Sequence, residues 1–508
     1  MEIESIKKLL KNVNIKRRID LYEACEAERY FKGDNDILYP TKVPKPWLES
    51  SSARGSDFDL GVRETEETTN VVDNKSVEKN PLRDADNRIA SHFYNFLVEQ
   101  KATYLFGNPV TFDAKSKTIN ETIEKQLGGH WRKLCKNLCI NASNCKVGWV
   151  HHWLDENNEY HYGIVDSKQV YAFWGGKVSQ ELLLLVRTYD YIDEIEGQEF
   201  EVVEIWDEEK CMAYQQEKNG AFVDLKPYNC FTFYNVDIQD LEESNIYYHG
   251  FSKVPFSAFF NNQFHINDLK PIKGYIDSYD KVYSLFTDNL EDVQQTIFIF
   301  ENLGGASLQQ MMQSLKENKA MKVISNERIH TDVRTLIVEI PTQAADDLLS
   351  LARKNIFEQG QGVDPSPENY AGNTSGEALK YMYANLEQKC AATKDEFEVG
   401  FEHFITMMVE GLHLNVDPHD IDIIWGEPTR INNESEAIEN VRNSDGIVSK
   451  RTLLSKHPFV ESVDDELEQI KKEDEEKEQV YPLNFGNRDN AVEEQNDEEQ
   501  NETDETKR

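Results

Sequence analysis

Five residues in a short stretch of the chain have the side chains best suited to bind a metal ion. They are Cys135, Cys139, Cys145, His151 and His152. Zinc sites use pairs such as C-x-x-C, and this spacing matches none of them. Free cysteine is also among the most deeply buried residue types. We therefore favour buried side chains over a metal-dependent enzyme built on residues 135–152, and we expect no metal.

Motifs for catalysis and nucleotide binding are missing from the rest of the sequence. The chain has no G-x-x-x-x-G-K-[ST] loop, and its paired glycines at 304–305 and at 360 and 362 lack the strand–glycine–helix setting of a phosphate-binding loop. Nucleophile-elbow, H-E-x-x-H and EF-hand patterns are also missing. We therefore expect no catalytic residue, no cofactor and no enzyme activity.

Carboxylates gather on the polar side of a predicted long helix at about 268–295. They are Asp277, Asp280, Asp288, Glu291 and Asp292. Runs of charge like this one are usually solvated helix faces. The alternative is the wall of a channel that repels DNA, because a surface short of Lys and Arg avoids strong attraction to phosphates. The residues themselves leave both interpretations open.

This helix and a second one are predicted to flank a small module. The first carries an apolar stripe with steps of three and four residues. The second begins after Pro341, with Thr342 as its N-cap, and ends near Gly360. The module between them is expected to hold strands at 297–300, 320–324 and 336–340 and a helix at 308–316.

A proline-bearing loop and a third, longer helix follow. Pro365 and Pro367 prevent a helix from continuing through the loop, and Thr374 and Glu377 have the spacing of a capping box. The apolar stripe then runs for roughly 35 residues, whereas a mean helix has about 11–12. Charges recur along it, so it is not a membrane span. Helices this long suggest that copies of the chain pack side by side.

The remainder of the chain is predicted to be mixed helix and antiparallel strand. Helices are expected at 2–31, 84–105, 118–142, 434–441, after Gly446–Ser449, and at 464–478. Strands joined by hairpin turns are expected at 147–154, 160–165, 170–174, 182–187, 200–206 and 212–215, with one more at 421–425. Residues 50–79 are polar and are predicted to form a flexible insert.

The chain is strongly acidic. Its 508 residues include 93 Asp and Glu against 55 Lys and Arg, a net charge of −38, and residues 461–508 hold 19 acidic and 6 basic residues. Broad binding to a phosphate backbone is excluded, because that affinity comes from Lys and Arg displacing counterions. Irregularly spaced cysteines predict reduced thiols, and no segment has the pattern of a secretory signal or membrane span. We expect a cytoplasmic protein without a membrane partner.

Several motifs, taken together and in order, resemble one protein family. They are Asn87-Arg88-Ile89, Phe93-Tyr94-Asn95-Phe96-Leu97-Val98, Gln100-Lys101-Ala102 and Tyr104-Leu105-Phe106-Gly107-Asn108-Pro109-Val110; Ser375-Gly376-Glu377-Ala378-Leu379-Lys380-Tyr381 with Leu386 and Lys389; and Asp420–Trp425, Pro428, Asn433-Glu434, Gly446-Ile447-Val448-Ser449 and Thr452. With the order of long helices, insert and loop, they make residues 5–478 resemble phage portal proteins of the type first defined in a Bacillus siphophage. The 50–79 insert and the acidic tail match nothing in that pattern.

The resemblance implies an α+β portal fold in a ring-shaped homo-oligomer, usually a dodecamer. Carried over to this chain, its parts are a β-containing wing (1–265), a first stem helix (266–297), a small α/β clip (298–341), a second stem helix (342–360), a tunnel loop (361–374), a kinked long helix with a helical crown (375–475) and a disordered acidic tail (476–508).

The resemblance also implies a function and partners. The ring would be the head–tail connector at one vertex of the capsid, a channel for DNA packaging and ejection in the virion, assembled in the host cytoplasm. Double-stranded DNA would pass through it. The terminase large subunit would dock during packaging and a head-completion adaptor protein afterwards, with scaffold and major capsid protein at the periphery. The alternative is an acidic oligomeric adaptor or DNA mimic without a channel.

Two sets of site residues follow from the resemblance. The tunnel loop would include Val363, Asp364, Pro365, Ser366, Pro367, Glu368, Asn369 and Tyr370, which otherwise form an ordinary surface loop. Candidates for lining the channel are Lys270, Lys273, Asp277, Asp280, Lys281 and Asp288, with the lysines as basic rings.

Overall fold

The computed structural model describes most of the chain. It covers residues 3–39, 85–176, 181–192, 197, 199–217, 225–235, 240–293, 297–301, 332–336, 342–366, 376–429, 434–457, 459–460 and 463–480. These residues belong to two compact units, Met1–Arg430 and Ile431–Arg508. The predicted insert 50–79, the predicted helix 308–316 and the predicted strand 320–324 lie outside the described residues.

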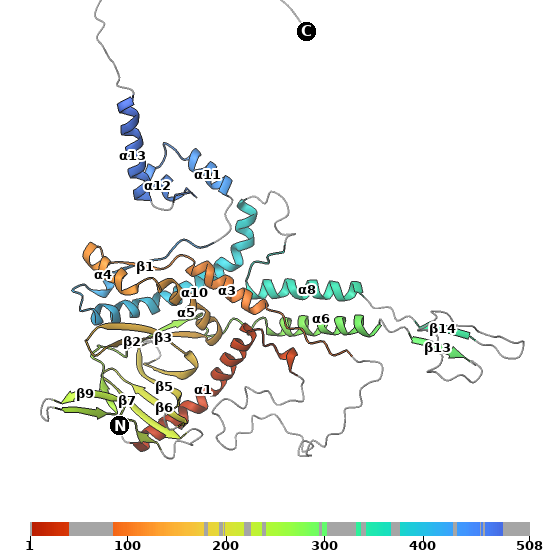
Figure 1. Ribbon diagram of the computed structural model, residues 1–508, viewed down its shortest axis with the longest axis horizontal. Helices are drawn as coiled ribbons and strands as arrows, with labels where there is room; N and C mark the ends of the chain where they lie inside the picture. The colour runs from red at the N-terminus through yellow and green to blue at the C-terminus, as the bar shows by residue number, and fades with distance from the viewer. Residues whose placement is uncertain are drawn as a thin grey trace, which may run out of the picture. The chain divides into compact units, whose positions relative to one another are not determined.

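The first unit combines long helices with antiparallel sheets (Figure 1). Its α-helices are α1 (Ile3–Phe31), α3 (Phe93–Phe106), α4 (Lys117–Leu127), α5 (Trp131–Cys145), α6 (Lys273–Val293), α8 (Thr342–Gly360) and α10 (Gly376–Gly411). The predicted mixture of helix and antiparallel strand is confirmed.

Two larger sheets form the β part of this unit. One has the strand order β12-β2-β3, with β12 (Phe256–Phe260), β2 (Val147–Leu154) and β3 (Tyr160–Val165). The other has the order β11-β7-β6-β5-β4, with β8 beside β7; its strands are β4 (Val170–Trp174), β5 (Leu182–Ile192), β6 (Glu199–Trp206), β7 (Lys210–Glu217), β8 (Lys226–Pro227) and β11 (Ile246–Tyr248). The strands predicted between residues 147 and 215 are confirmed. They divide between two sheets because β2 pairs with β12, a strand that was not predicted from the sequence.

Three two-stranded ladders complete the β structure that is described. They are β1 (Thr111–Asp113) with β15 (Asp422–Ile424), β9 (Phe231–Asn235) with β10 (Asp240–Ser244), and β13 (Ile297–Glu301) with β14 (Asp332–Leu336). The strand predicted at 297–300 is confirmed as β13. Of the strand predicted at 336–340, only Leu336 is among the described residues, and it is the last residue of β14.

The main core lies between α5, α10 and the β12-β2-β3 sheet. Phe397, Phe401 and Phe404 of α10 are fully buried there. The helix comes very close to the sheet at Gly400, where a Cβ atom would lie 2.7 Å from the backbone oxygen of Ala258. Only glycine permits this approach, because the interior has no space for an added atom.

Helix α1 connects the larger sheet to the long helices. Its first half buries Ile6 and Leu10 against β5 and β6, at an i, i+4 spacing typical of an amphipathic helix. Its last turn buries Tyr30 among residues of α3, α6 and α8. The helix predicted at 2–31 is therefore confirmed, and it spans two separate cores.

Three predicted helices differ from the observed ones. The helix predicted from residue 84 begins at Phe93, because the backbone N–H groups before it bond to side chains of α6. The helix predicted at 118–142 is two helices, since Gly128 ends α4 with a φ of 63°. The helix predicted from Asp268 begins at Lys273, after a turn in which the N–H of Ile272 donates to Leu269.

The other two long helices agree with prediction. Helix α8 begins at Thr342 and ends at Gly360. Helix α10 has 36 residues and changes direction along its course (Figure 1). The predicted capping residue Thr374 lies outside the described residues.

The second unit contains three helices among its described residues. They are α11 (Glu434–Asn443), α12 (Lys450–Ser455) and α13 (Val463–Val480). The hydroxyl of Ser449 caps α12 by accepting a hydrogen bond from the N–H of Thr452. The three helices predicted here are confirmed. The predicted tail 476–508 begins too early, because α13 continues to Val480.

Candidate functional site

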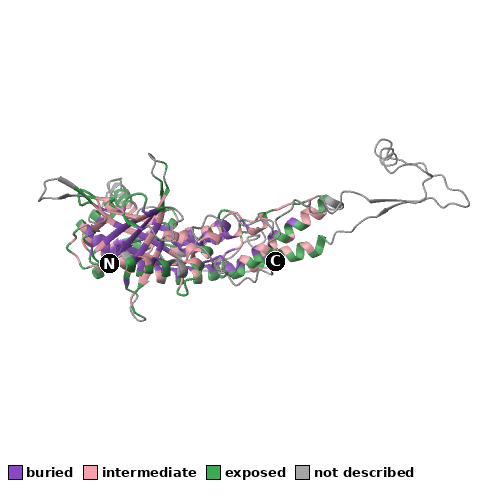
Figure 2. Ribbon diagram, turned by 90° about the horizontal axis from the view of Figure 1, so that it is seen from below, coloured by how far each residue is buried: buried purple, intermediate pink, exposed green. Residues whose placement is uncertain are grey.

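Helices α6 and α8 run side by side and are buried only at one end. There, Ile272 and Ile276 of α6 pack with Ile356 and Phe357 of α8 and with residues of α3. Beyond this cluster the two helices continue toward the β13–β14 ladder, and their residues are mostly exposed or half-buried (Figure 2). The helices therefore carry more surface than the subunit itself covers.

Much of this uncovered surface is apolar. The exposed apolar residues are Tyr275, Tyr283, Leu285 and Leu290 on α6, Leu348 and Leu351 on α8, and Tyr381 and Val399 on α10. Leu351 is 54% exposed and Tyr381 is 82% exposed. Clustered apolar side chains on the surface of a soluble protein mark sites of interaction. The long helices are therefore the best candidates for contacts between copies of the chain.

The polar side of α6 binds the extended segment that precedes α3. Asp280, Ser284 and Asp288, spaced four residues apart, accept hydrogen bonds from backbone N–H groups. The donors are Ser91, Ile89 and Asn87, at 3.0, 3.0 and 2.7 Å. Asp280 also accepts a bond from Asn35 Nδ2 at 2.6 Å and is only 1% exposed. A buried carboxylate is neither a solvated face nor a channel wall, so both interpretations are wrong for Asp280.

Lys273 and Asp277 belong to a polar cluster where α6 meets the end of α1. Lys273 Nζ lies 2.8 Å from Asp277 Oδ2 and 2.9 Å from Asp36 Oδ2, and the Tyr30 hydroxyl donates to Asp277. Burial alone would lower the pKa of Lys273, but its bonds to the two carboxylates outweigh burial and raise that pKa. Burial and the bond to Asp277 raise the pKa of Tyr30. These pairs fasten α6 to α1.

The predicted lining residues therefore do not share one face of the subunit. Asp280 and Asp288 face the extended segment, and Lys273 and Asp277 face the end of α1. Lys281 is exposed, and Lys270 is exposed and forms a surface pair with Glu23 at 3.3 Å. Lys270 and Lys281 are therefore the two lining candidates whose side chains keep exposed surface.

The first residues of the predicted tunnel loop are held by α3 and α8. The side-chain amide of Gln100 accepts a bond from the N–H of Val363 at 2.8 Å and donates to its carbonyl at 3.1 Å. Arg353 holds Asp364 through two nitrogens, at 3.1 and 2.6 Å. Burial would raise the pKa of Asp364, but the Arg353 bonds outweigh it and lower that pKa. The start of the loop thus has a fixed position.

Only half of the predicted loop set can be placed. Val363 is buried, Asp364 and Ser366 are half-buried and bonded to each other, and Pro365 is exposed. Pro367, Glu368, Asn369 and Tyr370 lie outside the described residues.

A buried carboxylate in the turn before α6 links residues within α3 and α10, close to the end of α8. Asp268 Oδ2 lies 3.1 Å from Lys101 Nζ and 3.3 Å from Lys389 Nζ, and Asp268 Oδ1 accepts a bond from Asn261 at 3.0 Å. Lys389 also donates to the carbonyl of Gly360 at 3.0 Å. Burial would raise the pKa of Asp268, but the two ammonium groups outweigh it and hold that pKa far below its ordinary value. The helix junction thus contains one negative and two positive charges.

This junction was not among the sites predicted from the sequence. A signal was present in α3, where Lys101 stands four residues from Leu97 and four from Leu105 on the apolar side. Lysine is almost never fully buried without a partner. A lysine inside an apolar helix stripe therefore indicates a buried carboxylate elsewhere, although it does not identify which one.

The residues of the metal-like cluster lie in different surroundings. Cys135 and Cys139 are in the main core, Cys145 donates to Glu28, His151 stacks on Phe256, and His152 bonds both Tyr160 and Ser257. Adjacent residues on a strand point to opposite faces, which separates the two histidines. Within the described ranges, the ligand atoms that are close enough for one ion belong to Asp155, Glu159 and His161 at the β2–β3 turn. Two backbone N–H groups already occupy the Asp155 carboxylate.

Two further observations concern the cysteines and the possibility of a helix that crosses a membrane. All seven cysteines are free thiols. None of the helices that the structure describes is long and apolar enough to cross a bilayer.

Comparisons with known proteins agree on one family. Residues 14–480 match the model of a family described as phage portal protein, SPP1 Gp6-like. The chain is 31% identical over 482 residues to the portal protein of Clostridium phage phiCD119, covering 92% of this chain and 94% of that protein. It is 26% identical over 400 residues to the portal protein of Bacillus phage SPP1, covering 76% of each.

Two solved structures are more distant. The chain has a TM-score of 0.39 and 8% identity to a chain in the neck of a native GTA particle with C12 symmetry, covering 71% of this chain and 88% of that one. For the neck of an empty GTA particle with C6 symmetry, the TM-score is 0.41 and the identity 10%, with the same coverage.

Proposed function

The chain belongs to the SPP1 Gp6-like family of phage portal proteins, and we propose that copies of it close into a ring at one capsid vertex, through which double-stranded DNA is packaged and ejected. The ring would contain twelve subunits. Residues 1–265 would be the wing, α6 and α8 the stem, 298–341 the clip, and 375–475 the kinked long helix and crown. The subunit has a structural role in this proposal and no catalytic one.

The apolar surface of the long helices is the observation that carries this proposal. Leu285, Leu348, Leu351 and their neighbours are exposed in the subunit, on helices that extend beyond its cores. A head-to-tail contact repeated around a closed ring would cover such a surface on every copy. An isolated subunit would leave it in water, at about 25 cal/mol for each Å² of apolar area.

The acidic composition supports a conduit. A channel must let DNA move, and a chain with net charge −38 cannot form the broad network of phosphate contacts that would hold it. We propose that Lys270 and Lys281, which keep free surface, contribute the basic positions of the channel wall. Residues 361–374 would project inward from the root fixed by Gln100 and Arg353.

The partners in this proposal belong to the capsid vertex. The terminase large subunit would dock during packaging and a head-completion adaptor afterwards, with scaffold and major capsid protein at the periphery. The protein would assemble in the host cytoplasm and remain in the virion.

Negative-stain electron microscopy and native mass spectrometry of the purified full-length chain test the ring. We expect closed rings with a central hole and a mass of about twelve subunits. An acidic adaptor or DNA mimic would instead remain a monomer or dimer at high protein concentration, and that result would overturn the proposal.

A further inference from the structure

One segment of this acidic chain contains no acidic residue. Residues 125–154 lack Asp and Glu, although 93 of the 508 residues of the chain are acidic. The segment comprises the end of α4, the whole of α5 and the strand β2 (Figure 1). Its cations must therefore either pair with carboxylates from other elements or remain unpaired.

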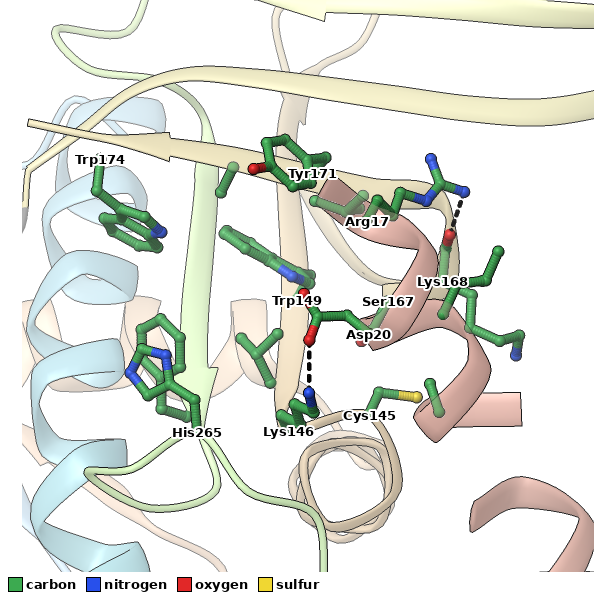
Figure 3. A pocket seen from close by; sticks show the side chains of 16 residues that line it. Arg17, Asp20, Cys145, Lys146, Trp149, Ser167, Lys168, Tyr171, Trp174 and His265 are labelled. Atoms are coloured by element: carbon green, nitrogen blue, oxygen red, sulfur yellow. Dashed lines mark hydrogen bonds and ion pairs between the residues drawn. The ribbon is translucent and has the colours of Figure 1, made fainter. Parts of the chain in front are cut away.

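Two cations of this segment are paired in that way. Lys146 Nζ, just after α5, lies 2.5 Å from a carboxylate oxygen of Asp20 (Figure 3) and 2.6 Å from one of Glu23. Lys136 Nζ lies 2.7 Å from Glu99 of α3. The acidic residues of neighbouring elements thus neutralise the cations that lie against the body of the subunit.

The other three cations lie at the corner between α4 and α5. They are Lys125 in the last turn of α4 and Arg132 and Lys133 in the first turn of α5. All three are exposed, and none forms an ion pair with a residue that the structure describes. His130, between the two helices, is also exposed. We call these four residues the basic corner.

The positions of Arg132 and Lys133 are unfavourable for the helix that carries them. The first turn of a helix has the partial positive charge of the macrodipole, so carboxylates stabilise it and cations do not. Helix α5 has no acidic residue in its first turn and no side chain that caps it. Helix stability therefore does not explain these two cations, whereas contact with a negatively charged group does.

The surroundings of the basic corner favour a short acidic protein segment over DNA. Glu121 and Glu124 are exposed on α4. Glu159 is exposed next to Tyr160, whose carbonyl accepts a hydrogen bond from Gln126 of α4 at 2.7 Å. Duplex DNA carries one phosphate charge for about every 1.7 Å of its axis, so a duplex that extends beyond the corner meets these carboxylates. A short segment can place all of its own carboxylates over the corner.

We propose that the basic corner binds a short, carboxylate-rich segment of another protein. The carboxylates accept charge-assisted hydrogen bonds from the exposed cations, and the planar guanidinium of Arg132 can hold one of them through two nitrogens. The basic corner belongs to a single subunit, so this contact does not depend on ring formation.

A fluorescein-labelled oligoglutamate peptide is the probe for a test by fluorescence anisotropy on the full-length chain. At 0.1 M sodium chloride, charges more than about 10 Å away are largely screened. We expect saturable binding that Arg132→Gln/Lys133→Gln weakens about three- to tenfold, the effect of losing two exposed ion pairs. Lys8→Gln/Lys11→Gln on α1 is the matched control, because both lysines are exposed and unpaired among the described residues. It should leave binding unchanged.

Three binding results would overturn the proposal. The first is the absence of saturable binding by the folded wild-type chain. The second is equal weakening by the two double variants, which would mean that the peptide does not select the basic corner. The third is tighter binding of a labelled DNA duplex than of the oligoglutamate peptide under the same conditions.

Thermal unfolding separates this role from a structural one. Arg132→Gln/Lys133→Gln removes two cations from the positive end of α5, so its unfolding midpoint should equal or exceed that of the wild type. A lower midpoint would show that the two cations stabilise the fold, and it would overturn the proposal.

A photo-crosslinker at Asn137, an exposed residue one turn after Lys133 on α5, tests for a protein occupant in assembling particles. We expect a product in which the partner peptide is rich in Asp and Glu, and Arg132→Glu/Lys133→Glu should reduce its yield. An unchanged yield would show that the basic corner does not direct the contact. A product that joins two copies of this chain would also overturn the proposal.

Discussion

Asp268 is the residue on which the helix junction depends electrostatically. Its carboxylate faces two lysines in an interior where it is almost fully buried. Removing one partner from a buried ion pair usually costs about 3–5 kcal/mol, because the remaining charge is left uncompensated. Here the two lysines are not equivalent, since Lys101 is 1% exposed and also bonds Ser143 and Asn261, whereas Lys389 is 12% exposed.

We predict that Lys101→Met destabilises the fold far more than Lys389→Met. Lys101 also donates to Ser143 and Asn261, and its side chain is 1% exposed. Its loss should cost about 3–5 kcal/mol. Loss of Lys389 removes one lysine–lysine repulsion and leaves the Lys101–Asp268 pair, so we expect about 1 kcal/mol. Urea unfolding of the full-length variants measures both, and equal losses would contradict this division of roles.

A second residue-scale prediction concerns acid. His403 bonds to Ser257 at 2.9 Å, and burial lowers the pKa of His403 to about 4. The folded state therefore favours the neutral ring. The stability that this preference contributes is fully present above about pH 6.5, the ordinary histidine pKa. As the pH falls from about 6.5 toward 4 the contribution is lost, up to about 3 kcal/mol.

Replacing His403 with Gln should flatten this part of the pH dependence. Urea midpoints at pH 7 and pH 4.5 would differ less in His403→Gln than in the wild type. His413→Gln is the control, because His413 is a histidine of the same region that is exposed and has no tight partner of this kind. An unchanged difference in His403→Gln would mean that other groups cause the acid sensitivity.

At the scale of elements, α6 replaces the hydrogen bonds that the residues before α3 lack. Asp280 accepts the N–H of Ser91 at 3.0 Å, and Ser284 and Asp288 accept those of Ile89 and Asn87. We predict that Asp280→Ala increases hydrogen exchange of the Ser91 amide at least tenfold, since its acceptor is lost. The α6 amides should remain protected, because alanine is the best helix former.

The control for this exchange experiment is Asp346→Ala on α8, an exposed carboxylate. It should leave the amides of residues 87–91 unchanged. Equal exchange in Asp280→Ala and the wild type would show that the segment is held by packing alone.

The same ladder shows what local sequence patterns can and cannot predict. Ile89 has helical spacing from Phe93, so the sequence indicates a helix, yet the acceptors for this segment are about 190 residues away along the chain. Strand β1 is similar, because Thr111–Asp113 is defined by its pairing with β15 and has no local signal. By contrast, α1, α8 and α10 were predicted closely, since a long apolar stripe with clear ends is contained in the residues themselves.

The candidate site was predictable to a smaller extent. The carboxylates of α6 were recognised as a polar face, but the burial of Asp280 depends on Asn35 and Ser91, which lie far away in sequence. The junction of Lys101, Asp268 and Lys389 combines three elements, and only its lysine in α3 is anomalous in the sequence. Long-range pairing of polar groups is the information that periodicity does not contain.

At the scale of the whole molecule, net charge opposes assembly. Each chain carries −38, so copies repel one another at low ionic strength. The screening length falls from about 30 Å at 0.01 M salt to about 10 Å at 0.1 M. We therefore predict that the purified chain forms more rings at 0.3 M than at 0.02 M sodium chloride, measured by native mass spectrometry. A ring fraction that falls with salt would indicate that attractive ion pairs dominate the interface.

Leu351 allows assembly to be separated from folding. It is 54% exposed on α8 and lies outside the buried cores of the subunit. Leu351→Lys should therefore change the stability of the isolated subunit by no more than about 0.5 kcal/mol, as is usual for surface positions. If α8 contacts the next copy, the same change places a charge in an apolar interface and also removes about 1.5–3 kcal/mol of burial. Repeated at every contact of the ring, this loss should leave few rings at protein concentrations where the wild type is assembled.

Leu351→Met keeps the apolar volume and should assemble normally. Rings of Leu351→Lys in wild-type yield, seen by negative stain, would place the subunit contacts elsewhere than on this face of α8.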